Sequence, residues 1–235
     1  MITKEQIAEK LMGRYQKMDM GSSLEKGQFK VLFKEAVKDY YPQLKEQYAG
    51  QLIYGVSFEI AGVVQKTYSD DFFTAVYFNT EEMYQENIED CEEDEKSYYR
   101  FEAWAEWDVT TAESALFGKL QDYLKQNSLK YCSEISDCRE ILGKEAALWY
   151  EENELDFEEA FEEESEHIRF WMAEALGELR NEGFWEEQGN AGIYVIPFGG
   201  ECDIDNEELI QTYHKMDLGY HGTEYLDYLE SLDGC

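Results

Sequence analysis

The spacing of apolar side chains predicts several helices. A capping box at residues 3–6, followed by apolar residues at helical intervals, predicts an N-terminal helix that ends at Gly21. A second pattern starts at Ser22, and Pro42 is expected to kink or stop that helix. A Thr-Thr-Ala-Glu box at 110–113 opens another helix, and Gly183 is expected to end a long one. The predicted helices after the second cover residues 110–124, 133–151, 156–182, 205–216 and, more weakly, 224–232.

Short runs that are rich in β-branched and aromatic residues predict strands at 52–60, 72–78, 98–109 and 193–196. In the third run apolar and charged residues alternate, which gives its sheet one apolar and one charged face. This parity places Trp107 in the core, whereas Trp104 shares the charged face and needs either a covering helix or a partner. We expect an α+β fold, with a mainly antiparallel sheet of about four or more strands packed by several helices. The expected organisation is a possible N-terminal extension at 1–21 and a single domain at 22–235.

Charge narrows the classes of partner. The chain has 53 Asp or Glu against 20 Lys or Arg, a formal net charge of -33. Residues 1–50 hold nine basic and seven acidic residues, so residues 51–235 carry 11 against 46. The acid peaks at 81–95 and at 151–166, where ten of sixteen residues are acidic. Nucleic acids and anionic membranes would be repelled, so we expect neither as a partner; a basic protein, a polyamine or a cation would be attracted.

The chain is expected to be cytosolic. It lacks the order of a secretory signal at its start, and none of its apolar runs approaches the ~20 residues that span a bilayer. Its five cysteines include no C-x-x-C pair, so reduced thiols are expected.

The sequence carries no complete motif for catalysis or metal binding. Glu164-x-x-His167 has the spacing of one half of a di-iron site, but a second pair is missing. The run that starts at Asp203 resembles an EF-hand loop, yet Glu208 stands where the turn requires glycine. No catalytic residue, metal ligand or cofactor is therefore assigned. A hydrolase with a hidden carboxylate pair stays open as an alternative.

Three segments in sequence order resemble the bacterial domain of unknown function 4303 family. They are the apolar run at 52–58, the Phe-Asn-Thr-Glu-Glu segment at 78–82, and the Tyr-Tyr-Arg-Phe segment at 98–101 that continues to Trp104 and Trp107. The resemblance covers residues 29–216 and implies an α+β fold, a helix start at 79–82 and no established enzyme activity. Residues 100–104 depart from the family's Arg-Trp-Ser-Pro pattern, and 126–151 look like added length. Similar acidic families often look like immunity proteins, which bind and neutralise a toxin.

The leading hypothesis is an acidic binding protein that inhibits a basic toxin domain, such as a nuclease, by occupying its phosphate-binding cleft. A third hypothesis is an adaptor or DNA-mimic regulator, which the sequence cannot distinguish from a toxin inhibitor. The residues expected to face the partner lie in the two acidic peaks and are Glu158, Glu159, Glu162, Glu163 and Glu166, with Glu92, Glu93 and Asp94 second.

Overall fold

The computed structural model describes residues 23–61, 73–89, 91–92, 96, 99–100, 107–111, 114–127, 164 and 166–196. In chain order its labelled elements are α2 (Lys26–Gln47), β1 (Ile53–Ala61), β2 (Phe73–Thr80), α3 (Glu81–Asn87), β3 (Asp108–Thr111), α5 (Ala115–Asn127), α8 (Phe184–Glu187) and β4 (Tyr194–Ile196). A further helix covers residues 166–181.

The sheet is built on one long hairpin. β1 and β2 pair antiparallel from Ile53 opposite Thr80 to Ala61 opposite Phe73, with an irregularity between Ile53 and Gly55. Two short strands lie along its edges in the order β3-β2-β1-β4. β3 continues the antiparallel pairing beside β2, whereas β4 runs parallel to β1.

The predicted fold class is wrong. Helix predominates over strand in the described residues, and the long antiparallel pairing is that of β1 with β2, to which β3 adds a short antiparallel strand. β3 and β4 add four and three residues, and β4 is parallel. The sequence pattern overestimated the sheet because residues 98–109 look like a strand, yet Tyr99 and Arg100 are helical and extended structure starts at Asp108.

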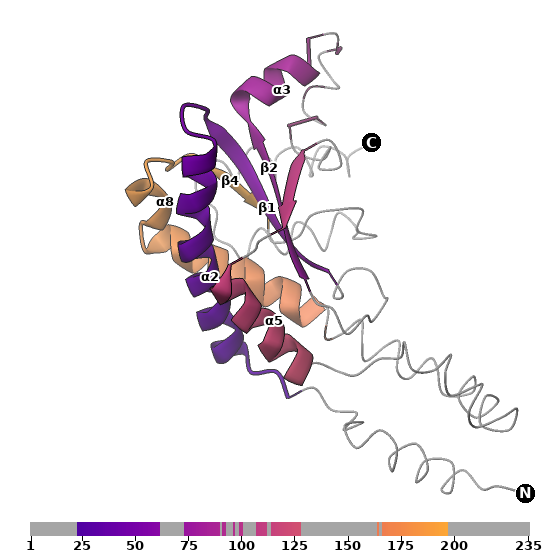
Figure 1. Cartoon of the computed structure of the whole chain (residues 1–235), viewed down its shortest axis with the longest axis vertical. Coiled ribbons are helices and arrows are strands. Elements are labelled where there is room, and N and C mark those ends of the chain that lie inside the picture. Colours follow the sequence, from indigo (N-terminus) through magenta and orange to yellow (C-terminus); the bar gives the residue numbers. More distant parts are fainter. Residues whose placement is uncertain are drawn as a thin grey trace, which may run out of the picture.

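Helices cover one face of the hairpin, and the core lies between them. Figure 1 shows α2, α5 and the helix over 166–181 together on one side of the strands. Alternation along β1 turns Val56, Phe58 and Ile60 to this side, and all three are buried. The ring of Phe58 lies 5.7 Å from that of Phe33 on α2 and 6.4 Å from that of Phe117 on α5. Aromatic contacts therefore join the three elements.

Several helix and strand predictions are confirmed, and others need correction. The strands near 52–60 and 72–78, the end of the long helix before Gly183 and the burial of Trp107 are confirmed. Pro42 does not stop α2, which continues to Gln47 because the neighbouring Tyr41 and Leu44 are buried in the core. The helix expected from residue 110 begins at Ala115 instead.

The cap of α5 differs from the prediction as well. Thr110 and Thr111 belong to β3, and the hydroxyl of Ser114 accepts a hydrogen bond from the Phe117 N–H at 3.1 Å. A serine hydroxyl that bonds the third residue onward is a standard N-cap. The predictions for residues 1–21, 133–151, 205–216 and 224–232, and for Trp104, lie outside the described residues.

Candidate functional site

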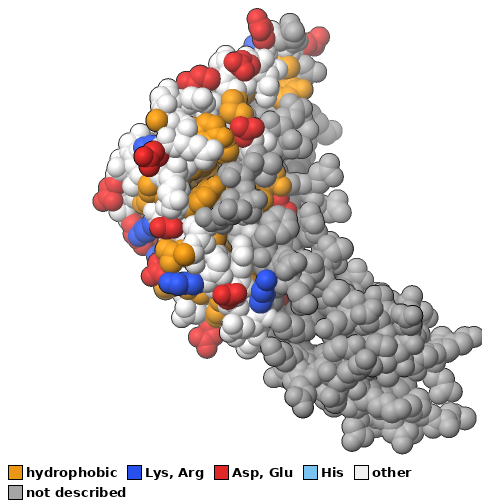
Figure 2. Space-filling view, in the orientation of Figure 1, with side chains coloured by type: hydrophobic (Ala, Val, Ile, Leu, Met, Phe, Trp, Pro, Cys, Tyr) orange, Lys and Arg blue, Asp and Glu red, His pale blue; other side chains and the backbone are white. Residues whose placement is uncertain are grey.

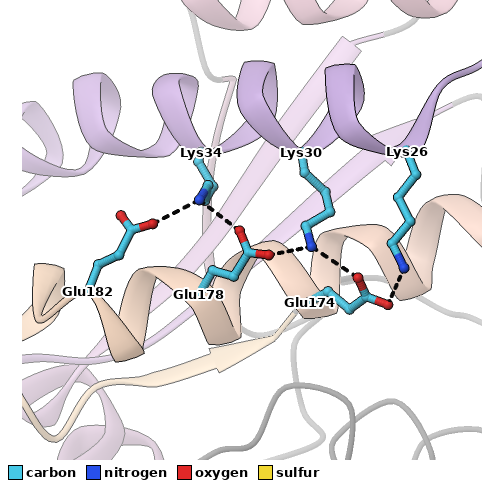
Figure 3. A network of polar contacts seen from close by, with 6 residues as sticks. All are labelled: Lys26, Lys30, Lys34, Glu174, Glu178 and Glu182. Atoms are coloured by element: carbon cyan, nitrogen blue, oxygen red, sulfur yellow. Dashed lines mark hydrogen bonds and ion pairs between the residues drawn. The ribbon is translucent and has the colours of Figure 1, made fainter.

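A ladder of ion pairs joins α2 to the helix over 166–181 (Figure 3). Its members stand four residues apart on each helix: Lys26, Lys30, Lys34 and Lys38 on one side, and Glu174, Glu178 and Glu182 on the other. Four-residue spacing puts side chains on one helical face with a rise of about 6 Å between them. The two rows therefore match step by step, and the helices run parallel.

Each carboxylate of the ladder contacts two lysines. Glu174 lies 2.6 Å from Nζ of Lys26 and 3.0 Å from Nζ of Lys30. Glu178 contacts Lys30 and lies 2.7 Å from Nζ of Lys34. These contacts offset an unfavourable helix dipole, because Lys26 and Lys30 stand in the first turns of α2, where cations are disfavoured.

The ladder shifts the pKa values of Lys30, Lys34 and the three glutamates in the directions that favour charge. Hydrogen bonds to Glu178 and Glu182 raise the pKa of Lys34. Burial alone would raise the pKa of Glu178, but hydrogen bonds from Lys30 and Lys34 outweigh it and lower that pKa. These directions favour the charged forms of Lys34 and Glu178, so the ladder is an internal structure rather than a reactive site.

The ladder does not reduce the acidity of the rest of the chain. It holds four lysines and three glutamates, which leaves 16 basic and 50 acidic residues elsewhere, a net charge of -34. The basic residues counted in the first fifty positions thus serve in part as internal partners of Glu174, Glu178 and Glu182. The four-residue spacing of both rows is visible in the sequence, but spacing within one helix does not show which helix it pairs with.

Exposed acid lies on several of the described elements, including α2, α5 and α8, and α3 with the residues directly after it carries one group of it. This helix begins where the family resemblance implied, and the Thr80 hydroxyl caps it by accepting a hydrogen bond from the Met83 N–H at 3.2 Å. Glu82, Glu86 and Glu89 are exposed on α3 and directly after it. Within the described part of the chain these three carboxylates take part in no ion pair. Figure 2 shows acidic side chains at the end of the molecule that carries α3.

The residues expected to face a partner are only partly placed. Glu92 is exposed just after α3, and Glu166 is half-buried at the start of the helix over 166–181. In Figure 1, α3 lies well away from the start of the helix over 166–181. The remaining candidates lie outside the described residues: Glu158, Glu159, Glu162, Glu163, Glu93 and Asp94.

A buried carboxylate lies on the sheet face opposite α2 and α5. Glu59 is 4% exposed, and its Oε2 accepts a hydrogen bond from the Tyr77 hydroxyl at 2.7 Å. Burial raises the pKa of Glu59, and the bond from Tyr77 opposes that rise. Ser57 stands opposite Tyr77 in the register, and its buried hydroxyl has no hydrogen-bond partner among the residues that the structure describes. Chemically, this cluster can hold or release a proton at Glu59.

Other features expected of enzymes or membrane proteins were sought among the described residues. They contain no group of three or more His, Cys, Asp or Glu side chains placed to hold a metal ion. Across the same residues, no helix combines the length and the apolar character that a membrane crossing requires. Comparison with family models, with curated proteins and with solved structures found no match. The resemblance to the domain of unknown function 4303 family therefore stays a prediction.

Proposed function

We propose that this protein is a cytosolic, non-enzymatic binding protein that presents an acidic surface to a basic protein partner. The observation that carries the proposal is the division of charge in the structure. The lysines of α2 are engaged with Glu174, Glu178 and Glu182, whereas Glu82, Glu86 and Glu89 are exposed without an ion pair in the described part of the chain. An acidic surface of this kind accelerates encounter with a cationic protein and is sensitive to salt.

The partner class that fits best is a toxin domain that acts on nucleic acid. Such a domain must grip phosphates with Lys and Arg, and a carboxylate row can occupy the same cleft. The protein would then act as an immunity-type inhibitor. Glu92, Glu166 and the acidic residues at 158–163 extend the proposed surface, because four of those six positions are acidic and Phe157 and Phe161 stand four residues apart.

One observation favours a second candidate, a hydrolase. A buried acid with a raised pKa is a common mark of an active site, and Glu59 has this property. A carboxylate-pair mechanism needs a second acid within reach, and in the described part of the chain the hydrogen-bond partner of Glu59 is Tyr77 rather than another acid. The binding proposal therefore ranks first.

A capture experiment at low salt tests the proposed function. Tagged wild-type protein is incubated with lysate of the source organism, in parallel with a variant that reverses Glu82, Glu86 and Glu89 to Lys. The matched control reverses Glu35, Asp39 and Asp122, which are equally exposed on α2 and α5. We expect one basic polypeptide to bind wild type and the control but not the α3 variant. Equal loss in both variants, or capture of no basic polypeptide, contradicts the proposal.

A further inference from the structure

One arginine joins α3 to the segment that follows the acidic tract. The guanidinium carbon of Arg100 lies 4.6 Å from the ring centre of Tyr54 on β1 and 5.0 Å from that of Tyr84 on α3. Its Nη1 lies 3.4 Å from Oε2 of Glu81, in the first turn of α3. Both distances to the rings are within the range of a cation–π contact.

Backbone groups of the same segment complete the junction. The Tyr54 hydroxyl donates a hydrogen bond to the Arg100 carbonyl at 3.3 Å, and the Tyr84 hydroxyl donates one to the Lys96 carbonyl at 3.3 Å. The side chain of Asn79 fixes the Tyr54 hydroxyl from the other side, at 3.1 Å. Tyr54 and Tyr84 are both buried and their rings meet edge to face at 5.6 Å. Packing and hydrogen bonds thus hold the residues on which Arg100 rests.

The chain between these two fixed points is strongly acidic. Residues 89–95 have the sequence Glu-Asp-Cys-Glu-Glu-Asp-Glu, six acids in seven positions. Like charges at this density repel one another and favour separation of the two ends. The junction opposes that separation, because Tyr84 holds the α3 end while Lys96 and Arg100 hold the other.

Arginine suits this role better than lysine. A planar guanidinium can lie against aromatic rings while its N–H groups bond a carboxylate, whereas an ammonium is a strongly hydrated point charge. Arg100 uses both properties, since it contacts two rings and Glu81 at once. A neutral residue here would lose both the contact with the two rings and the ion pair with Glu81.

We propose that Arg100 is a positioning residue that closes the base of the acidic tract and keeps α3 ordered before a partner arrives. The proposal concerns the free protein, and only its consequence for binding rests on the proposed function. A pre-ordered surface loses less conformational freedom on binding. Removal of Arg100 should therefore speed dissociation of a basic partner and leave its charge-steered association nearly unchanged.

Cys91 provides a probe of closure in the free protein. It is half-buried after α3, its N–H donates to the Ile88 carbonyl at 3.2 Å, and its thiol lies 3.4 Å from the Asn87 carbonyl. The full chain is labelled with iodoacetamide, and peptide mass spectrometry follows Cys91 separately from the other four cysteines. We expect Arg100→Gln to raise its labelling rate by roughly fivefold or more, and Arg100→Lys to raise it less.

Two controls separate this effect from net charge and from global unfolding. Lys119→Gln removes the same charge from an exposed position on α5 and should leave Cys91 labelling unchanged. Tyr84→Phe keeps the ring, removes the bond to Lys96 and should give a smaller rise. Equal labelling in Arg100→Gln and Lys119→Gln overturns the proposal, as does a rise matched by faster amide exchange throughout β1 and β2. None of these readouts needs a partner, so they remain decisive if the proposed function fails.

Discussion

Lys34 and Glu178 form the central pair of the ladder, with Nζ of Lys34 2.7 Å from Oε2 of Glu178. Each also contacts a second partner, because Lys34 reaches Glu182 and Glu178 reaches Lys30. The pair therefore couples two parallel helices that pack on the same sheet. It also explains why part of the basic charge near the start of the chain is not available to a partner.

Reversal of Glu178 tests the ladder directly. Glu178→Lys places a third cation beside Lys30 and Lys34, and we expect a loss of about 1–2 kcal/mol in the free energy of unfolding. Urea denaturation measures this change. The double variant Lys34→Glu with Glu178→Lys restores opposite charges and should recover part of the loss. No recovery would show that the pair is not coupled.

The ladder carboxylates predict a dependence of stability on pH. The pKa values of Glu174, Glu178 and Glu182 are lowered in the folded protein from an ordinary value of 4.5. Their contribution is therefore present above about pH 4.5 and is lost as the pH falls through the lowered values. Unfolding midpoints measured from pH 7 to pH 3 should fall less steeply when all three are changed to Gln. An equally steep fall would assign acid sensitivity to other groups.

Glu59 predicts the opposite dependence. Because burial raises its pKa in the folded protein, the folded state holds the proton more tightly than the unfolded state. Stability from this group is complete below the unfolded pKa and is lost as the pH rises through the folded value. Glu59→Gln should therefore stabilise the protein more at pH 8 than at pH 4. If the gain in the free energy of unfolding does not grow with pH, the charged form of Glu59 is not destabilising in the folded protein.

Gly55 tests the packing of the hairpin. A Cβ at this position would lie 2.6 Å from the Trp107 ring, closer than real Cβ contacts allow. We expect Gly55→Ala to cost about 1–3 kcal/mol in the free energy of unfolding, because Trp107 is buried and cannot move freely. Gly118→Ala, where a Cβ on α5 meets nothing within 4 Å, should instead stabilise by about 0.5–1 kcal/mol. Similar changes in the free energy of unfolding for the two variants would contradict the close packing of Trp107 against Gly55.

Local signals predicted much of the fold, and the failures have physical causes. The hairpin strands were visible because β-branched and aromatic residues cluster in them, and Trp107 was placed correctly by parity. Tyr99 and Arg100 lie in a run of strand-like composition but are helical. Contacts of Arg100 with Tyr54 and with Tyr84 on α3, which are distant in sequence, hold this segment in place. Pairing of Lys34 with Glu178 spans 144 residues, so periodicity on either helix alone could not reveal it. The raised pKa of Glu59 depends on burial in three dimensions.

The rate of association with the captured basic partner, measured against ionic strength, tests the central claim most directly. Wild type is compared with the variant that reverses Glu82, Glu86 and Glu89 and with the matched reversal of Glu35, Asp39 and Asp122. We predict that the α3 variant associates at least tenfold more slowly at low salt and with a flatter salt dependence, while the control changes little. Equal rates and equal salt dependence in the two variants would contradict the assignment of the acidic surface to α3.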